Sequence, residues 1–466
     1  MYELTIHLQS ESSTPLYLQL YNAIKVDIHA GSLSSGTKLP SKRKLAQHLG
    51  ISTLTVENAY GQLKAEGYLV SKPRQGVYVE QLQQLEHASL PALMNQHPSR
   101  SEKPEPTIDF HHGRIDTEHF PHNQWRKATL EALNNHDFLN TGNSKGEQLL
   151  REEMALYLFQ SRGVRCSPEQ IIIGAGTQHL LLLLTTLFDH NKDIAFEEPG
   201  FHRSKETFKQ QGFQLSPITL DQEGMNLEEL KQSSAKLAYV TPSHQFPTGV
   251  IMSISRRQAL LNWAENVSGY VVEDDYDGEF RFKGRPIPSL QGFDTADRVI
   301  YLGTFSKSLI PSARMSYMIL PNKLLRSFQQ LTPSPKQSVS RFEQNIFYHF
   351  MKKGYWERHL NKMRTVYRRK YEALTAAIAK HFGESARIIG DPAGLHLLLE
   401  INTHLSEKTI EMRAEAEGVR IYPASIYYEK QRIDKKPVLL LGFGGLTIRE
   451  IETGIAVLKR ISSEPI

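Results

Sequence analysis

The chain has 466 residues, too many for one ordinary hydrophobic core, so we expect two or three compact units. Hydrophobic residues make up 39% and charged residues 23%, a balance that excludes an intrinsically disordered chain. The single cysteine excludes an internal disulfide, and a formal net charge of +5 is too small for this length to identify a partner.

The first ten residues lack the basic segment and apolar core of a secretory signal. The most apolar run, residues 180–188, is much shorter than the roughly 20 residues that span a bilayer. Both observations favour a cytoplasmic protein with no membrane role.

Three helices are predicted at the start of the chain. The apolar residues of 15–28 fall largely on one helical face. Ser41 is the expected N-cap of a short second helix, which Gly50 ends. Ser52 is the expected N-cap of a third helix that runs to about Glu66. A helix, a glycine turn and a second helix have the spacing of a helix-turn-helix.

Two β-rich runs, 68–70 and 76–79, follow and predict a hairpin that forms a wing with cations at its tip. Hydroxyl side chains at the start of the third helix can reach phosphates or base edges, and nearby cations can neutralise the DNA backbone. The predicted DNA-binding residues are Lys42, Arg43, Lys44, Ser52, Thr53, Thr55, Lys72 and Arg74.

Residues 12–79 resemble the GntR-type winged helix-turn-helix. Its Leu-Pro-Ser-x-Arg signature stands at residues 39–43, and its Ser-x-x-Thr-Val helix start stands at residues 52–56. The resemblance implies a double-stranded DNA operator as partner. Many members have Arg directly after the capping serine, where this chain has Thr53, so the preferred operator sequence stays open.

Residues 80–107 are rich in Gln, Ser, Pro and charged residues and are predicted to be a linker between a DNA-binding domain, 1–79, and an effector domain, 108–466. In the second domain strand-like and helical patterns alternate. Short β-rich runs at 237–241, 269–273 and 298–302 favour a mostly parallel sheet covered by helices.

Residues 301–311 contain a strand that ends in a Gly-Thr-x-Ser-Lys turn. Such a turn can present the amine of Lys307 on a hydroxyl-rich loop, and Arg314, seven residues later, can bind a dianion. This combination suits an aldehyde that carries a phosphate.

Two upstream segments support that interpretation. Residues 271–276 predict a buried strand that delivers Asp274 and Tyr276 at its carboxyl end, where open α/β sheets bind ligands. Residues 171–178 predict a strand that enters a helix through small residues, whose exposed amides can hold phosphate. Taken alone, this glycine-rich turn is equally compatible with a plain strand-to-helix connection.

These segments, in this order, resemble fold-type I aminotransferases, and together with the front domain they resemble the MocR subfamily of regulators. The further matching motifs are residues 198–201, 241–249, 273–280 and 303–307. The resemblance covers about residues 108–460 and implies pyridoxal 5′-phosphate as cofactor. It implies a Schiff base at Lys307, Asp274 at the pyridine nitrogen, Tyr276 at the ring hydroxyl and Phe201 stacked on the ring. The implied phosphate contacts are Gly176, Thr177, Thr304, Ser306 and Arg314.

The chain departs from working aminotransferases at several positions. Phe246 replaces the asparagine that bonds the ring hydroxyl, and Thr141 stands where a tyrosine contacts the neighbouring subunit's phosphate. Residues 440–443 lack the arginine that grips a substrate carboxylate. Arg203 is a candidate anchor for an effector anion, with a structural or surface arginine as the alternative.

These departures favour a regulator over an enzyme, with at most residual half-transamination. The preferred hypothesis is that pyridoxal phosphate is the signal, as in the branch that controls its synthesis. One alternative is a sensor of an amino acid or amine through an external aldimine, and another is an active aminotransferase with an accessory DNA-binding domain. The resemblance also implies a domain-swapped homodimer. No metal site is predicted.

Overall fold

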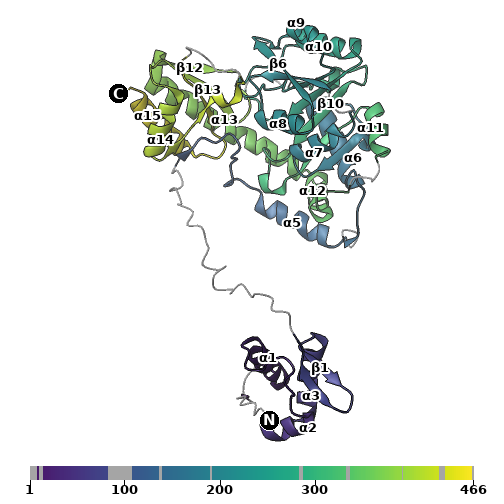
Figure 1. Cartoon of the computed structure of the whole chain (residues 1–466). Coiled ribbons are helices and arrows are strands. Elements are labelled where there is room, and N and C mark those ends of the chain that lie inside the picture. The colour runs from purple at the N-terminus through teal and green to yellow at the C-terminus, as the bar shows by residue number, and fades with distance from the viewer. Residues whose placement is uncertain are drawn as a thin grey trace. The chain divides into compact units, whose positions relative to one another are not determined.

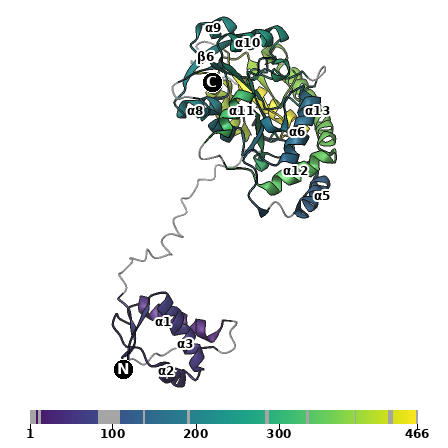
Figure 2. The same cartoon turned by 90° about the vertical axis from the view of Figure 1, so that its right-hand side faces the viewer.

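The computed structural model describes residues 8–9, 14–81, 108–135, 139–188, 192–282, 287–331, 336–390, 392–429 and 436–463. The chain divides into two compact units, residues 1–103 and 104–466, which Figures 1 and 2 show from two sides. Beyond Gln81, the predicted linker lies outside the described residues.

The smaller unit contains the three predicted helices, α1 (Leu16–His29), α2 (Lys42–Leu49) and α3 (Thr53–Ala65). Ser41 caps α2 by accepting a hydrogen bond from the amide of Lys44, and Gly50 ends it with a φ of 66°. Ser52 caps α3 by accepting from the amide of Thr55. The predicted caps are therefore confirmed.

The hairpin pairs β1 (Leu69–Lys72) with β2 (Gly76–Val79) antiparallel, with Leu69 opposite Val79. Arg74 lies in the connecting turn with a φ of 61°. The core of this unit joins Leu20 and Ile24 of α1 to Tyr60 and Leu63 of α3, all fully buried. Helix-turn-helix plus hairpin is the winged arrangement that the sequence predicts.

The larger unit is built on an eight-stranded sheet with the order β4-β11-β10-β9-β8-β5-β6-β7. The neighbours from β10 through β9, β8 and β5 to β6 pair parallel, and β4, β11 and β7 join antiparallel. The strands are β4 (Ile171–Gly174), β5 (Asp193–Glu198), β6 (Gln214–Asp221), β7 (Gly224–Met225), β8 (Leu237–Val240), β9 (Tyr270–Asp275), β10 (Val299–Thr304) and β11 (Ser316–Ile319).

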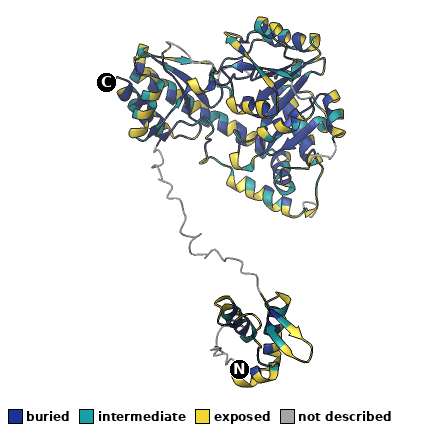
Figure 3. Cartoon of the chain, in the orientation of Figure 1, coloured by how far each residue is buried: buried dark blue, intermediate teal, exposed yellow. Residues whose placement is uncertain are grey.

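Both faces of the sheet are covered, as a mostly parallel sheet requires. Along β9, Val271 packs with α9 (Leu227–Gln232) and α10 (Ile254–Asn266), whereas Val272 packs with α7, α8 and α11. Figure 3 shows the buried strands between partly exposed helices. The helices of the second face are α7 (Thr177–Thr185), α8 (His202–Gln210) and α11 (Asn322–Gln329).

A second layer contains α5 (His122–Leu133), α6 (Gln148–Arg162), α12 (Arg341–Lys352) and the long α13 (Tyr355–Phe382). Beyond it, a four-stranded sheet has the order β12-β13-β16-β15 and packs with α14 (Glu407–Ala416) and α15 (Ile448–Ser463). The strands are β12 (Ala386–Ile389), β13 (His396–Ile401), β15 (Tyr422–Pro423) and β16 (Val438–Gly442), and β3 (Ile108–Asp109) pairs parallel with β14 (Val419–Arg420).

The expected α/β architecture is confirmed. Among the described residues, no helix combines the length and apolar character needed to cross a bilayer.

Candidate functional site

Lys307 follows β10, in the turn that the sequence predicts. Its amine donates a hydrogen bond to the backbone carbonyl of His112. Burial lowers the pKa of this amine to about 8, although the carboxylate of Asp277 opposes the shift. A larger fraction of the amine is therefore neutral near pH 7 than for an exposed lysine, which favours reaction with an aldehyde.

An anion cradle lies where β4 enters α7. Gly176 is the N-cap of α7 with a φ of 91°, and a Cβ placed there would stand 2.7 Å from Nη2 of Arg314. Thr177 is the first residue of α7, whose first amides have no partner within the helix. A helix start facing a guanidinium across a glycine is a suitable phosphate site.

Thr304 and Ser306 belong to the turn that carries Lys307. Oγ1 of Thr304 accepts hydrogen bonds from the amide of Ser306 at 3.2 Å and from the hydroxyl of Ser316 at 2.9 Å. Ser316 is the first residue of β11 and pairs with Thr304 of β10. Its hydroxyl holds the side chain of Thr304 in place at the end of β10.

Asp274 lies at the carboxyl end of β9 and is buried. Its carboxylate accepts a hydrogen bond from the hydroxyl of Tyr239 on the neighbouring strand β8, and Ser204 donates to that hydroxyl at 2.9 Å. Burial raises the pKa of Asp274 to about 7, and the hydrogen bond from Tyr239 opposes this. A protonated pyridine nitrogen placed against Asp274 would stabilise its charged form.

Aromatic side chains from separate segments surround this region. The ring centroid of Phe246 lies 5.2 Å from that of Phe201 and 6.0 Å from that of Tyr276. The hydroxyl of Tyr276 donates to the carbonyl of His244 at 2.9 Å. The structure therefore brings Phe201 and Tyr276 together, with Phe246 between them.

Three histidines without a predicted role lie near these rings: the half-buried His112 and the buried His244 and His396. Burial lowers the pKa of His112 to about 2, so this imidazole is neutral. Its Nδ1 has no hydrogen-bond partner among the described residues. Only His244 lies in a motif that the sequence singled out. The other two come from distant segments that carry no local signal.

His244, Asp277 and His396 hold potential metal-ligand atoms within 4.8 Å of one another, a grouping that sequence spacing did not reveal. Nδ1 of His244 lies 3.0 Å from Oδ2 of Asp277, and Nε2 of His396 lies 3.3 Å from the carbonyl of Pro247. These contacts satisfy the three side chains as a polar network without an ion.

Arg203 is exposed on α8. Its positive charge is nevertheless close enough to contribute to the lowered pKa of His112, behind burial and the charges of Lys307 and His111. It also lowers the pKa of Tyr427, against the larger effect of burial. The charge of Arg203 therefore acts on the aromatic region, although the side chain itself is exposed.

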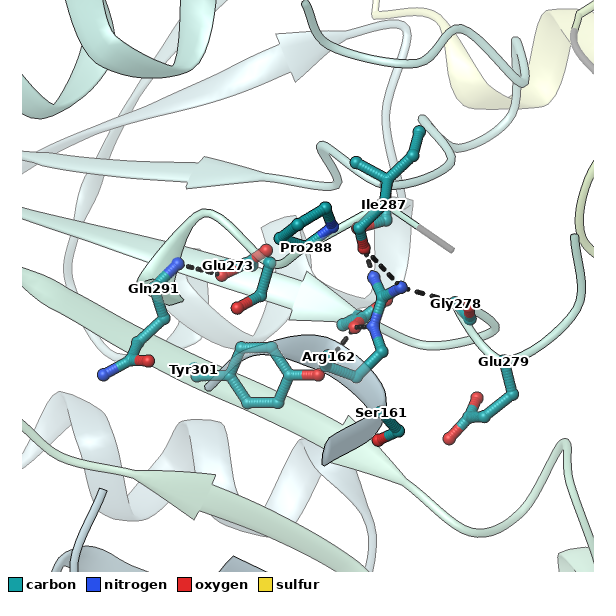
Figure 4. Close-up of polar contacts among 12 residues, drawn as sticks. Ser161, Arg162, Glu273, Gly278, Glu279, Ile287, Pro288, Gln291 and Tyr301 are labelled. Atoms are coloured by element: carbon teal, nitrogen blue, oxygen red, sulfur yellow. Dashed lines mark hydrogen bonds and ion pairs between the residues drawn. The ribbon is translucent and has the colours of Figure 1, made fainter. Parts of the chain in front are cut away.

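Arg162, the last residue of α6, holds the loop after β9 in place through its side-chain hydrogen bonds (Figure 4). Its Nε donates to Oδ2 of Asp275 at 2.7 Å, and its Nη1 donates to the carbonyl of Ile287 at 2.7 Å. Nη2 donates to the hydroxyl of Ser243 at 2.7 Å, and Tyr301 donates to Asp275 at 2.6 Å. This buried network fixes the backbone between Asp274 and Tyr276.

In the smaller unit, the predicted DNA-binding side chains surround the start of α3 and the hairpin. Arg43 and Thr53 are exposed, whereas Lys42 forms an ion pair with Glu57. The hydroxyls of Ser52 and Thr55 lie 2.8 Å apart and serve the helix cap. Lys72 lies over the ring of Tyr78, 4.9 Å from its centroid. Lys44 and Arg74 complete the set.

Comparison with known proteins assigns each of the two units to a protein family. Residues 16–79 match the model of bacterial regulatory proteins of the gntR family, and residues 105–434 match the model of aminotransferase class I and II. The chain is 43% identical to the regulator YdeL of Bacillus subtilis, over 98% of this chain and 99% of that protein. It is 32% identical to the probable rhizopine catabolism regulatory protein MocR of Rhizobium meliloti, over 97% and 94% of the two chains.

The chain belongs to the MocR-like family of transcription regulators. Another relative of this MocR-like chain is the pyridoxine biosynthesis regulator PdxR of Corynebacterium glutamicum, 31% identical over 85% of this chain and 86% of that protein. The fold is that of aminotransferases. The crystal structure of a kynurenine aminotransferase of Pyrococcus horikoshii in complex with PMP superposes with a TM-score of 0.70 at 27% identity, over 77% of this chain and 91% of that chain.

Proposed function

We propose that this MocR-like regulator binds pyridoxal 5′-phosphate at Lys307 and that the bound vitamer changes the affinity of the DNA-binding unit for its operator. The observation that carries the proposal is the buried amine of Lys307, whose pKa is lowered to about 8, in the same domain as an anion cradle at Gly176 and Arg314. The vitamer supplies an aldehyde that condenses with an amine and a ring that stores charge at its nitrogen.

The surrounding residues fit the other parts of that molecule. Gly176, Thr177, Thr304, Ser306 and Arg314 would hold the phosphate. In addition, Asp274 would pair with the pyridine nitrogen, Tyr276 would meet the ring hydroxyl, and Phe201 would stack on the ring.

We propose a sensor and not an enzyme because two groups that tune catalysis are replaced. Phe246 is buried and offers no hydrogen bond to a ring hydroxyl. Leu440 and Leu441 lie within the buried strand β16, where a carboxylate-binding arginine would be expected. The relative named as a pyridoxine biosynthesis regulator supports the vitamer as signal. Control of vitamin B6 synthesis genes would follow from that signal.

A second candidate is a sensor of an amino acid or amine. The observation that favours it is the charge of Arg203, which reaches the region of His112 and Tyr427. A carboxylate held by Arg203 would place its amine toward Lys307. A third candidate, an active aminotransferase, predicts formation of keto acid over many turnovers.

We further propose a homodimer in the cytoplasm. Leu149, Leu156 and Phe159 on α6 expose 50%, 54% and 59% of their surface. Their spacing places them on one face of the helix, which a second copy would cover. Exchange of the DNA-binding units between the two copies, as implied by the family, would let the dimer read paired half-sites.

A gel-shift assay with DNA from upstream of the protein's own gene tests the switch. Pyridoxal phosphate should change the apparent Kd for this DNA at least several-fold. An effect seen only with a candidate amino acid or amine would select the second function. Unchanged DNA binding with every vitamer and amine would contradict both sensing functions.

The amine of Lys307 predicts the pH dependence of cofactor attachment. Below a pKa of about 8 the neutral fraction rises about tenfold for each pH unit, and above it the neutral fraction levels off. The attachment rate, followed by absorbance, should therefore increase from pH 6.5 to about 8 and then flatten. A steady increase beyond pH 10 would instead indicate an exposed lysine.

Gly176→Ala tests the anion cradle. The added Cβ would force Arg314 aside, and a φ of 91° strains any residue with a Cβ. Affinity for pyridoxal phosphate should fall at least about tenfold, a loss of roughly 1.4 kcal/mol. Gly212→Ala is the matched control, because its φ is 82° and its Cβ would meet nothing within 4 Å. Equal affinities in the two variants would contradict the cradle.

Arg43→Ala tests the DNA interface. Loss of one phosphate contact should weaken binding of all DNA sequences alike and reduce the slope of log K against log salt by about 1. Lys42→Ala should have a smaller effect, because Glu57 already balances that charge. Titrations of labelled DNA at several salt concentrations measure both slopes.

A further inference from the structure

A cavity of about 490 Å³ lies at the amino ends of the parallel strands of the large sheet, whereas Lys307 follows the carboxyl end of β10. Its lining includes Asp193, Leu237 and Tyr270, the first residues of β5, β8 and β9. Asp274 lies at the other end of β9, roughly 13 Å away along the strand. Any occupant of this cavity is therefore separate from the Lys307 site.

One part of the cavity wall is aromatic and apolar. Phe188 and Tyr270 lie edge to face with ring centroids 6.0 Å apart, and Phe213 and Leu324 also line the space. Phe213, Leu324 and Tyr270 are buried in the fold and hold these walls in place. A cavity of this size, lined by both apolar and polar residues, has the dimensions of a small-molecule site.

Cations from three separate segments surround the aromatic walls. Lys192 precedes β5, Lys236 precedes β8, and Lys323 lies on α11. Among the described residues, neither Lys236 nor Lys323 forms an ion pair, whereas Lys231, Lys352 and Lys353 do. Two ammonium groups that line one cavity and have no acidic partner among the described residues favour an anion.

Two cations lie over the aromatic rings of the cavity wall. Lys192 lies 5.6 Å from the ring centroid of Phe188, and the guanidinium of Arg298 lies 5.5 Å from that of Tyr270. Asp193, an acid in the lining, accepts a hydrogen bond from the hydroxyl of Ser234. Among the described lining residues, the cavity thus combines an excess of positive charge with aromatic side chains.

We propose that this cavity binds an aromatic phosphate, with its planar ring against the wall that Phe188 and Tyr270 form together and its phosphate at Lys236 and Lys323. Ammonium groups bind phosphate as point charges, and aromatic side chains accept a flat ring edge to face or offset-stacked. Nucleoside monophosphates and phosphorylated pyridine vitamers share this chemistry. The proposal does not depend on the function proposed for Lys307.

Calorimetric titration of the full-length protein tests the proposal. The Lys307 site is first saturated with pyridoxal phosphate and reduced with borohydride, so that it cannot take up more ligand. Adenosine 5′-monophosphate and pyridoxine 5′-phosphate are then titrated separately, with adenosine and inorganic phosphate as the two halves of the ligand. At least one ring phosphate should bind once per chain, at least about tenfold more tightly than either half.

Charge reversal provides the matched variants. The double variant Lys236→Glu/Lys323→Glu should weaken ring-phosphate binding at least about tenfold. Lys380→Glu/Lys408→Glu makes the same change in net charge on exposed helical positions away from the cavity and should bind normally.

The identity of the ligand that binds separates a nucleotide source from a vitamer source, and either supports the site. The proposal is overturned if neither ring phosphate binds at millimolar concentration, if inorganic phosphate binds as tightly, or if charge reversal at the cavity has no effect. The nucleotide titration remains informative even if Lys307 takes up no cofactor.

Discussion

Lys307→Ala is expected to abolish covalent attachment of pyridoxal phosphate and the response of DNA binding to it. Among the residues described at this site, no other amine has its pKa lowered by burial, so the remaining binding would be noncovalent and at least about a hundredfold weaker. Absorbance spectra of the purified protein and the mass added by borohydride reduction measure attachment. Gel shifts with and without the vitamer measure the response.

Lys209→Ala is the control for this experiment, because Lys209 is an exposed residue of α8. The variant should keep both the absorbance band of the attached cofactor and the response of DNA binding to pyridoxal phosphate. Full vitamer-dependent DNA binding by Lys307→Ala would show that the covalent bond is not needed for the switch. A wild-type protein that stays colourless at saturating vitamer would remove the cofactor from the proposal altogether.

Arg162→Met should produce the largest loss of stability. The change leaves the buried carboxylate of Asp275 without its cation and leaves two carbonyls without their donor. Removing one partner of a buried ion pair typically costs about 3–5 kcal/mol. We expect a loss of that size in the free energy of unfolding of the larger unit.

Tryptophan fluorescence during urea unfolding measures this loss directly, because Trp125, Trp263 and Trp356, the three tryptophans of the chain, all lie in the larger unit. Arg358→Met removes an exposed arginine and should change stability by less than about 0.5 kcal/mol. Adding Asp275→Asn to Arg162→Met should restore part of the loss. A loss below about 1 kcal/mol for Arg162→Met would show that solvent compensates the carboxylate.

The sequence predicted the elements whose signals are local. Helix caps at Ser41 and Ser52 and the glycine at position 50 fix the ends of two helices through contacts within a few residues. Lys307 was predictable for the same reason, since strand, turn and lysine are contiguous. The exact strand ends were less predictable. β8 ends at Val240, one residue early, because the amide of Thr241 donates to Glu197 instead.

The contacts made by segments far apart in the chain were not predictable. Tyr239 reaches Asp274 because β8 and β9 are parallel neighbours, and strand order is a property of the whole sheet. The rings of His112 and His396 are neighbours at the site, although the two residues are far apart in the chain. Arg162 looked like an ordinary residue before a glycine. Only its burial against Asp275 reveals its role.

Arg162 also has a consequence for assembly. Helix α6, which ends at Arg162, presents Leu156 and Phe159 to solvent. The guanidinium of Arg162 donates a hydrogen bond to Asp275, in the segment that carries Tyr276. If the proposed cofactor binds and the proposed dimer forms through α6, both events would act on this helix and its guanidinium. Thermodynamic reciprocity then requires that whatever factor the vitamer adds to the association constant, association adds to the vitamer's affinity.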